Sequence, residues 1–597
     1  MPKSKNINIK YTSREFSTIK EDLVDYASRY YPDSYKDFTD ASFGSLIFDT
    51  VSYVGDVLSY YVDYSVNESF LDTAIEFENV RKHARALGYD YTGVPTAYGK
   101  LTVYLMVPAN IDGTAPDTSY LPTLKRGSTF SGGSVNYTLM EDILFTDPNV
   151  EFVAARFNGT TGATTHFACR AIGVVQSGQF FEVEVPVDSV FERFKRIRIG
   201  PSTITSVEEV FDSEGNQYYE VDNLAQEVIF VETTNKNART DGVRSILKPF
   251  VATRRFVVQR DDTGTFLQFG FGSEDEDSTG LVDPSRIALT LHAKRTISSN
   301  SFDPTKLIST NKLGISPSNT TLTITYSSTE EQGGSVGVNT ITAVGDIELA
   351  FDTQFTLDET KRSEVLNSLE VTNDEPLTSV NSEITIEELK QRAIAHYASQ
   401  NRAVSRQDYE SLVYNMPNNF GAIKRANIVN DPSSTNRRLS LYVISEDSNR
   451  NLSTTNDITK TNLKNWLSRY KMLNDVIDII DAKIINFSVD FDVLLDKRFD
   501  PDSVLSSCIE EVQDYFSEVG YIGEPIYLTR IYQRLNNVDG VTDTRRVTLK
   551  NKAGGRYSSS SLSFDLALSK DGTYVKIPKN AISELKFPDT DIKGTIK

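Results

Sequence analysis

The chain has 597 residues, which is too long for one hydrophobic core and predicts about three to five domains. Hydrophobic residues make up 39% and charged residues 24%, so the composition excludes global disorder. The 62 basic and 82 acidic side chains give a net charge of −20, which disfavours nucleic acid as a partner. The two cysteines, Cys169 and Cys508, are too few for a disulfide framework or a four-thiolate zinc site, so we expect a reducing compartment.

Neither a signal sequence nor a membrane span is predicted. The first residues, MPKSKNINIKYTSREF, contain no apolar stretch. The most apolar segment, LIFDTVSYVGDVLSYYV, is interrupted by Asp49 and Asp56. We therefore expect no membrane association.

Apolar residues recur every three or four positions from Phe43 onward, which is typical of one face of a helix. The residues with this spacing are Phe43, Leu46, Ile47, Val51, Val54, Val57, Leu58 and Tyr61. The segment SFLDTAIEFENVRKHARALGY, residues 69–89, repeats the spacing and predicts a second helix that ends at Gly88.

The period changes to two between Leu101 and Val107, as expected for a strand with two different faces. The same alternation occurs between Phe181 and Val187 and again at Leu322 and Ile324. Clusters of Gly, Asn, Asp, Ser and Thr separate these segments. The pattern predicts a β-rich region with long loops.

A mixed pattern follows. Two residue pairs have the spacing of helix capping boxes, namely Thr385 with Glu388 and Ser405 with Asp408. These pairs predict helices over 386–399 and 406–415. Strands then alternate with helices in what looks like one sheet, which predicts an α+β sandwich. Leu562, Phe564, Leu566, Leu568, the KDG turn and TYVKI predict a last hairpin.

The chain is accordingly predicted to be an α+β multidomain protein with five regions. Residues 1–98 are a helical bundle region, and 99–380 a β-rich middle with room for two subdomains. Residues 381–420 are a helix-pair joint, 421–550 an α+β C-terminal domain, and 551–597 a terminal hairpin and tail.

Two glycine-containing segments resemble nucleotide-binding loops but depart from them. GVPTAYGKL, residues 93–101, has five residues between its glycines instead of four, and Leu101 stands where Ser or Thr must reach magnesium. GFGSED, residues 270–275, has Asp275 in place of the third glycine. Neither segment predicts a nucleotide site.

The remaining candidates for chemistry are isolated. His166 and Cys169 are spaced like half of a zinc site, but no second pair lies nearby. SEDED, residues 273–277, lacks the alternation of a calcium loop and predicts a solvated acidic turn. His396 adjoins an apolar helix face and is expected to pack there. We predict no catalytic residue, metal or cofactor and no enzyme; carboxylates brought together from distant segments, as in glycosidases, are the enzymatic alternative.

One segment resembles a known protein family. RAIAHYASQNRAVSRQDYESLVYNMP, residues 392–417, is similar to the hallmark segment of the Baseplate J-like family, including its Asp408-Tyr409-Glu410 helix. Three other segments also resemble the family, namely residues 41–89, FLQFGFG at 266–272, and PIYLTRIYQRLNNVDGVTDTRRVTL at 525–549. Residues 300–326 and 580–597 resemble, more narrowly, the large wedge subunits of T-even-like contractile-tailed bacteriophages. FGFGSEDED departs from the family, because many relatives have a second tight glycine turn there.

The resemblance implies structural work in the virion tail baseplate, after assembly in the host cytoplasm. Two copies of such a subunit join other baseplate wedge proteins, and neighbouring wedges close a hexameric ring around the tail tube. The ring relays host contact to sheath contraction. The implied partners are a second copy, other wedge proteins, and sheath-proximal and tube-proximal tail proteins, without nucleic acid or membrane. A tail-fibre or adhesin-type receptor-binding protein is the alternative favoured by the β-rich middle.

Two sets of residues are candidates for this work. The first is an apolar helix face for a bundle shared with partner chains, and the alternative for it is burial inside the same chain. The second is a rigid corner before the C-terminal domain, which is itself the candidate ring or dimer contact. The bundle residues are Phe43, Leu46, Ile47, Val51, Val54, Leu58 and Tyr61, and the corner residues are Asp408, Tyr409, Glu410, Leu412 and Val413.

Overall fold

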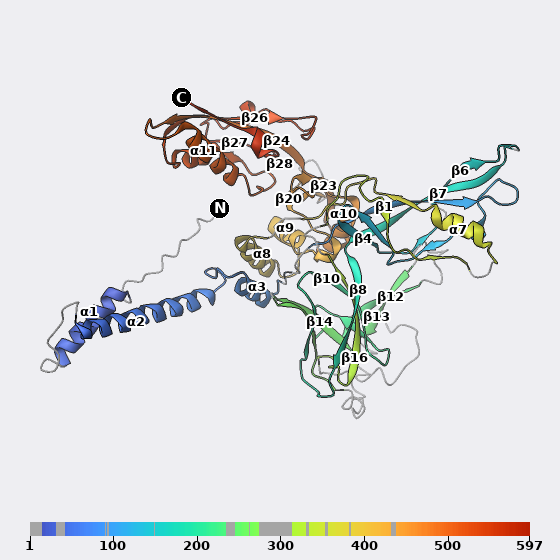
Figure 1. Cartoon of the computed structure of the whole chain (residues 1–597), viewed down its shortest axis with the longest axis horizontal. Coiled ribbons are helices and arrows are strands. Elements are labelled where there is room, and N and C mark those ends of the chain that lie inside the picture. Colours follow the sequence, from blue (N-terminus) through green and yellow to red (C-terminus); the bar gives the residue numbers. More distant parts are fainter. Residues whose placement is uncertain are drawn as a thin grey trace. The chain divides into compact units, whose positions relative to one another are not determined.

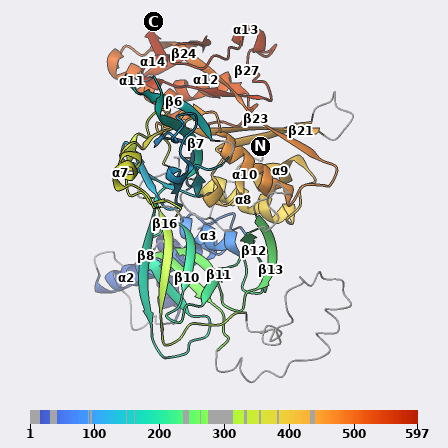
Figure 2. The same ribbon diagram turned by 90° about the vertical axis from the view of Figure 1, so that its right-hand side faces the viewer.

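The chain folds into two compact units. One comprises Met1–Tyr91 and Ile384–Gln400, and the other Thr92–Glu383 and Asn401–Lys597. Figures 1 and 2 show the elements of both units in a computed structural model. The structure describes residues 15–30, 42–89, 91, 95–147, 150–160, 162–234, 245–261, 263–273, 313–329, 334–352, 356–380, 384–430 and 438–597.

The first unit is helical, as predicted for the N-terminal region. Helix α1 lies alongside the long helix α2 (Figure 1), and Lys20 of α1 forms an ion pair of 2.8 Å with Asp49 of α2. Helices α3 and α8 share a small core that includes Val80 and Leu389. The helices are α1 (Phe16–Tyr30), α2 (Phe43–Glu68), α3 (Phe77–Ala86) and α8 (Ile386–Ser399).

The second predicted helix starts later than the sequence pattern indicated. A turn follows α2, and α3 begins only at Phe77. The buried Glu68 carboxylate accepts hydrogen bonds from the Ile75 backbone N–H (2.8 Å) and from Asn79 Nδ2 (2.9 Å). The Thr73 hydroxyl donates to the Asn67 carbonyl. These bonds satisfy backbone groups of the turn and so replace the helical hydrogen bonds that the pattern predicted.

The middle of the second unit is β-rich, as predicted. A seven-stranded sheet runs β17-β3-β4-β7-β1-β19, with β6 also paired to β7, and a second runs β8-β16-β10-β11-β14-β15-β9. The first sheet contains β1 (Tyr98–Pro108), β3 (Thr129–Gly132), β4 (Val135–Leu139), β6 (Glu151–Phe157), β7 (Thr164–Ser177), β17 (Ala343–Val344) and β19 (Glu370–Thr372). The second contains β8 (Gln179–Val187), β9 (Arg196–Gly200), β10 (Ile204–Phe211), β11 (Gln217–Glu220), β14 (Arg255–Asp261), β15 (Gly264–Phe269) and β16 (Thr320–Ser328).

Smaller elements accompany these sheets. Each large sheet buries its own apolar cluster, with Leu105 and Phe130 in the first and Phe256 and Leu322 in the second. The smaller elements are β2 (Thr123–Leu124), β5 (Ile143–Leu144), β18 (Leu349–Ala350), β12 (Val228–Thr234), β13 (Ser245–Val251), the 3-10 helix η1 (Thr118–Tyr120) and α7 (Glu359–Asn367).

The C-terminal part mixes helices and strands, but its strands form two principal sheets where the sequence indicated one. One sheet pairs β20, β21, β22 and β23, and the other pairs β26, β24, β28 and β29. The first group, with its helices, is α9 (Arg406–Tyr414), η3 (Asn418–Phe420), β20 (Arg425–Asn430), β21 (Arg438–Glu446), β22 (Leu452–Ser453), α10 (Asp457–Ser468) and β23 (Val476–Asp481). The second is β24 (Lys483–Leu495), α11 (Pro501–Tyr515), α12 (Leu528–Asn536), β26 (Val541–Lys552), β28 (Ala581–Glu584), α14 (Pro588–Asp591) and β29 (Ile592–Ile596).

The predicted last hairpin is wrong in its first strand. Residues Phe564–Ala567 form the short helix α13, and β27 (Tyr574–Val575) pairs with β25 (Ile526–Tyr527). Phe564 is buried in the core around β24, whereas Leu566 is 88% exposed. A strand would have placed both side chains on one face, so burial of Phe564 alone favours the helical turn.

Replacing Glu68 tests the turn between α2 and α3. Glu68→Ala removes the acceptor of the Ile75 N–H, and an unsatisfied buried group costs about 1–3 kcal/mol. We expect amide hydrogen exchange at Ile75 to accelerate about tenfold or more at neutral pH. Asp72→Ala, an exposed carboxylate of the same turn, is the control and should leave exchange unchanged.

The pH dependence of this effect has a defined sign. Burial raises the pKa of the Glu68 carboxyl, but the hydrogen bonds from Ile75 and Asn79 outweigh burial, so the pKa lies below its ordinary value. Stability from a lowered pKa is present above the unfolded-state pKa and is lost as the pH falls through the folded-state pKa. The difference between wild type and Glu68→Ala should therefore shrink below about pH 4. A difference that persisted undiminished at about pH 2 would contradict this assignment.

Candidate assembly surface

Small side chains on α2 face α1. Ser45, Ser52 and Ser59 are all buried, with exposed fractions of 4%, 0% and 8%, and they are spaced seven residues apart. Gly55 lies beside Ile19 of α1, and a Cβ atom built there would be 3.2 Å from Ile19 Cδ1. These small residues let the two helices approach closely.

The opposite face of α2 is apolar and exposed. At 100° per residue, Val54 lies about 200° around the helix from Ser52, so the two side chains point in nearly opposite directions. All seven predicted bundle residues lie on this outer face, and their exposed fractions range from 47% for Ile47 to 77% for Phe43. They are Phe43, Leu46, Ile47, Val51, Val54, Leu58 and Tyr61.

The exposed face extends beyond the predicted residues. Tyr53 at one edge of this face is 64% exposed, and Val62 at the other edge is 52% exposed. Monomeric proteins rarely expose a contiguous apolar surface of this kind, because water penalises it. The alternative of burial inside the same chain is not seen for these side chains in the described structure; the shared bundle itself stays a prediction.

Of the two predicted capping boxes, the one at Ser405 has both of its hydrogen bonds and the one at Thr385 has the first of them. The Ser405 hydroxyl accepts the Asp408 N–H (3.2 Å), and the Asp408 carboxylate accepts the Ser405 N–H (2.8 Å). The Thr385 hydroxyl accepts the Glu388 N–H (3.2 Å) at the start of α8. Both helices therefore begin at the residues that the sequence indicated.

The Asp408-Tyr409-Glu410 segment is tied to its own unit. Tyr409 is 2% exposed and donates to Asp475 Oδ2 at 2.7 Å. Burial raises the pKa of the Glu410 carboxyl, which accepts the Ile428 N–H at 3.4 Å. Leu412 and Val413 are buried in the core beneath β20 and β21. Polar and apolar groups of this segment thus fix α9 against the sheet.

The two helices of the joint belong to different compact units. Helix α8 ends at Ser399 in the first unit, whose last residue is Gln400, and α9 lies in the second unit, which resumes at Asn401. Gln400 and Asn401 have φ angles of 48° and 57°, in the left-handed region that few residues other than glycine and asparagine favour. A rigid corner between the helices stays a prediction.

The residues considered for chemistry occupy structural positions. His166 and Cys169 lie three positions apart on β7, which places their side chains on opposite faces of the strand. Burial raises the pKa of the Cys169 thiol to about 12. His396 is half-buried beside Tyr89, with ring centres 6.0 Å apart, and burial lowers its pKa despite a hydrogen bond with the Gly88 backbone.

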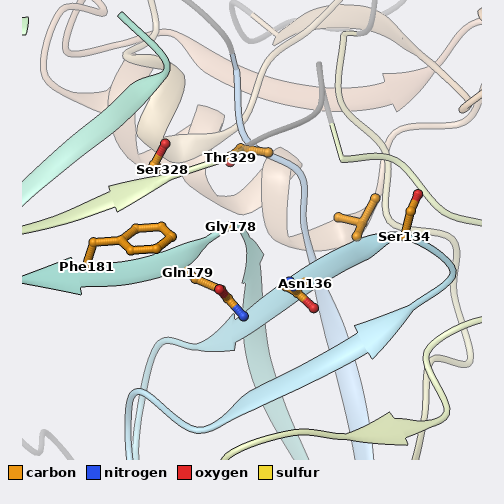
Figure 3. A pocket seen from close by; sticks show the side chains of 8 residues that line it. Ser134, Asn136, Gly178, Gln179, Phe181, Ser328 and Thr329 are labelled. Carbon is orange, nitrogen blue, oxygen red and sulfur yellow. The ribbon is translucent and has the colours of Figure 1, made fainter. Parts of the chain in front are cut away.

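The pocket in Figure 3 offers hydrogen-bonding groups but no acid or base. Ser134, Asn136, Gln179, Ser328 and Thr329 line it, together with glycine and apolar residues. None of its lining residues is a carboxylate, histidine, lysine or cysteine. It can therefore hold a small polar molecule but supplies no group for proton transfer.

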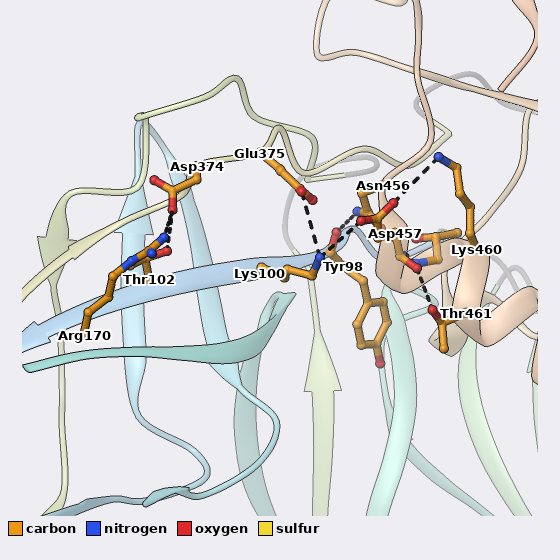
Figure 4. Close-up of polar contacts among 11 residues, drawn as sticks. Tyr98, Lys100, Thr102, Arg170, Asp374, Glu375, Asn456, Asp457, Lys460 and Thr461 are labelled. Carbon is orange, nitrogen blue, oxygen red and sulfur yellow. Dashed lines mark hydrogen bonds and ion pairs between the residues drawn. The ribbon is translucent and has the colours of Figure 1, made fainter. Parts of the chain in front are cut away.

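Gly99 and Lys100 belong to the segment that resembles a phosphate-binding loop, but they lie within strand β1. The Lys100 ammonium lies between Asp457 (3.3 Å) and Glu375 (3.9 Å), as Figure 4 shows. Beside it, the Asn456 amide donates to the Tyr98 carbonyl and also caps α10. These contacts hold α10 against β1 and leave no phosphate cradle there.

The described ranges contain no group of three or more His, Cys, Asp or Glu side chains placed to hold a metal ion. No helix among these residues is long and apolar enough to cross a membrane. The predicted acidic turn falls almost wholly outside the described structure, because only Ser273 of residues 273–277 lies within it.

Sequence reasoning missed two features of these surfaces. The seven-residue spacing of Ser45, Ser52 and Ser59 was visible in the sequence and indicates a face of close helix contact. Asp475, the partner of Tyr409, lies 66 positions away and carries no local signal.

Tyr409→Phe tests the packing of α9. The change leaves the ring in place but removes the donor to Asp475, a buried carboxylate with an exposed fraction of 2%. We expect the local free energy of unfolding to fall by about 1–3 kcal/mol. Trp466, the single tryptophan, donates to the Leu412 carbonyl and so reports this unfolding in urea.

The control for this measurement is Tyr397→Phe, which removes a hydroxyl from a side chain that is 64% exposed. Its urea midpoint should match wild type. Equal midpoints for Tyr409→Phe and wild type would show that the Asp475 hydrogen bond contributes nothing measurable.

Residues 15–86, which include α1, α2 and α3, match the family model described as bacteriophage baseplate protein, N-terminal domain. No curated protein matches the sequence. The cryo-EM structure of the anti-feeding prophage (AFP) baseplate, 6-fold symmetrised, is 10% identical, with 96% of this chain and 98% of that chain covered and a TM-score of 0.27. The type VI secretion TssK-TssF-TssG baseplate subcomplex is 10% identical, with 73% and 96% covered and a TM-score of 0.23. Scores this low do not establish a common fold, so it is the match over residues 15–86 that supports a baseplate protein.

Proposed function

We propose that the chain is a structural wedge subunit of a contractile phage tail baseplate, of the large gene-product-six type. Two copies join smaller wedge proteins, and six wedges close around the tail tube and relay host contact to sheath contraction. Sheath-proximal and tube-proximal tail proteins border this ring. The observation that carries the proposal is the outward apolar face of α2, within the segment that matches a baseplate N-terminal domain.

The energetics favour a bundle of several helices. Each of the seven outer side chains is about half exposed, so covering it contributes roughly 1 kcal/mol by area. Their sum, about 7 kcal/mol, is similar in size to the association cost of about 4–15 kcal/mol. Stable assembly therefore requires apolar faces from partner helices that match the face of α2.

Val54→Asp tests the bundle. An unpaired carboxylate buried among apolar side chains costs about 3 kcal/mol or more, which predicts a loss of partner affinity of roughly 100-fold. We expect the tagged variant, recovered from cells that produce the particle, to lose its co-purifying tail proteins in native mass spectrometry. Wild type should retain two copies with smaller tail proteins.

The matched control is Ser17→Asp, which adds the same charge at an exposed position of α1. It should keep every partner, and the unfolding of the second unit should be unchanged in both variants. Normal assembly of Val54→Asp would contradict the bundle. A homotrimer without tail partners in the wild type would favour an adhesin.

The proposal also includes the absence of catalysis. A reducing-sugar assay on host surface polysaccharide measures the enzymatic alternative, in which two carboxylates act as acid and base. Turnover that a single carboxylate substitution abolishes would overturn a purely structural role.

A further inference from the structure

A groove in the second unit lies beside the exposed start of strand β6. Strands β4 and β6 both pair with the same edge of β7, and the groove opens between β4 and β6. Its volume is about 290 Å³, which suits about one or two side chains of a longer ligand. Its lining includes no residue of α2 or of the joint segment.

The groove has apolar walls. Ile172 of β7 is 54% exposed and Leu144 of β5 is 41% exposed, and both line it, with Val150 beside them. Val153, two positions after the groove residue Glu151, is 65% exposed on the same face of β6. Exposed apolar side chains therefore lie on both sides of the Glu151–Arg170 ion pair on this face.

The rim of the groove is acidic. Four carboxylates line it, at Glu141, Asp142, Asp147 and Glu151. Two cations contact them: Lys125 pairs with Asp142 (2.8 Å), and Arg170 pairs with Glu151 (3.4 Å) and with Asp374 (3.1 Å). The carboxylates outnumber these cations, so the rim attracts a ligand of positive charge.

Strand β6 also offers backbone groups. It pairs only with β7 among the described strands, so its other edge presents unpaired N–H and C=O groups. An exposed edge of this kind is the usual template for adding an extended segment of another protein. In such a segment alternate side chains point to one face, which fits a surface where apolar side chains and carboxylates alternate.

We propose that the groove and the free edge of β6 bind an extended segment of a partner protein in which lysine or arginine alternates with apolar residues. Apolar side chains of the segment cover Val153 and Ile172. Its cations pair with Glu141 and Glu151 at the rim. This contact goes beyond the proposed helix bundle and does not depend on it.

The probe is a fluorescently labelled ten-residue peptide of alternating lysine and valine, titrated into the full chain at about 150 mM salt. Glu141→Lys with Glu151→Lys should weaken binding at least tenfold, because it reverses the charge of the rim. The matched control, Glu182→Lys with Glu184→Lys, makes the same charge change at exposed positions of β8 and should leave binding within about twofold. Equal weakening by both pairs would overturn the site, because it would leave only long-range attraction.

Three further measurements test the apolar and edge contacts. Ile172→Thr keeps a β-branched side chain and should weaken binding about threefold. A peptide of alternating lysine and glycine should bind at least tenfold more weakly than the valine peptide. Bound valine peptide should slow amide hydrogen exchange along β6.

The remaining outcomes are also decisive. Absence of binding by wild type up to about 1 mM valine peptide, or equal binding of both peptides, would overturn the proposal. If the lysine variant does not fold, as judged by Trp466 fluorescence, Glu141→Gln with Glu151→Gln replaces it and should still weaken binding severalfold. Val54→Asp should bind the peptide like wild type, so failure of this site and failure of the helix bundle are distinguishable.

Discussion

The packing of small side chains between α1 and α2 decides which way the apolar residues of α2 point. Ser45, Ser52 and Ser59 occupy the inner face, so the larger apolar residues lie outside. The inner contact is weak by itself, because the buried hydroxyls of Ser52 and Ser59 have no hydrogen-bond partner in the structure. If α1 and α2 formed a stable pair by themselves, the large apolar residues of α2 would be expected to face α1. In the function proposed for the chain, helices of partner chains would cover this outer face.

The joint segment differs from α2, because its functional side chains have partners within the second unit. The Asp408 carboxylate holds the start of α9, the Tyr409 hydroxyl bonds to Asp475, and the Glu410 carboxylate accepts the Ile428 N–H. Burial keeps the pKa of Glu410 above its ordinary value, which disfavours the charged form there. Because all three side chains have partners in the second unit, the segment acts by positioning α9.

Local patterns predicted local features well. The period of α2, the capping box at Ser405 and the strand alternation of β1 and β24 all reappear in the structure, because each depends on neighbouring residues. Features that depend on distant partners were missed. Hydrogen bonds from Ile75 and Asn79 to Glu68 delay the start of α3. Burial of Phe564 against β24 favours a helical turn where a strand was predicted. Periodicity identified the apolar face of α2 but carries no information on what covers it, since exposure is a property of the folded chain.

The two proposed contact surfaces would attract partners by different physical interactions. The face of α2 is apolar, so its association follows the area removed from water and depends little on salt. The groove beside β6 combines apolar side chains with four carboxylates, so the proposed association there should weaken as salt screens the rim. A chain of net charge −20 repels other acidic chains at long range, which leaves basic segments as the partners that approach the groove fastest. Salt concentration therefore separates the two contacts: partners held through α2 remain at high ionic strength, and partners held through the groove dissociate.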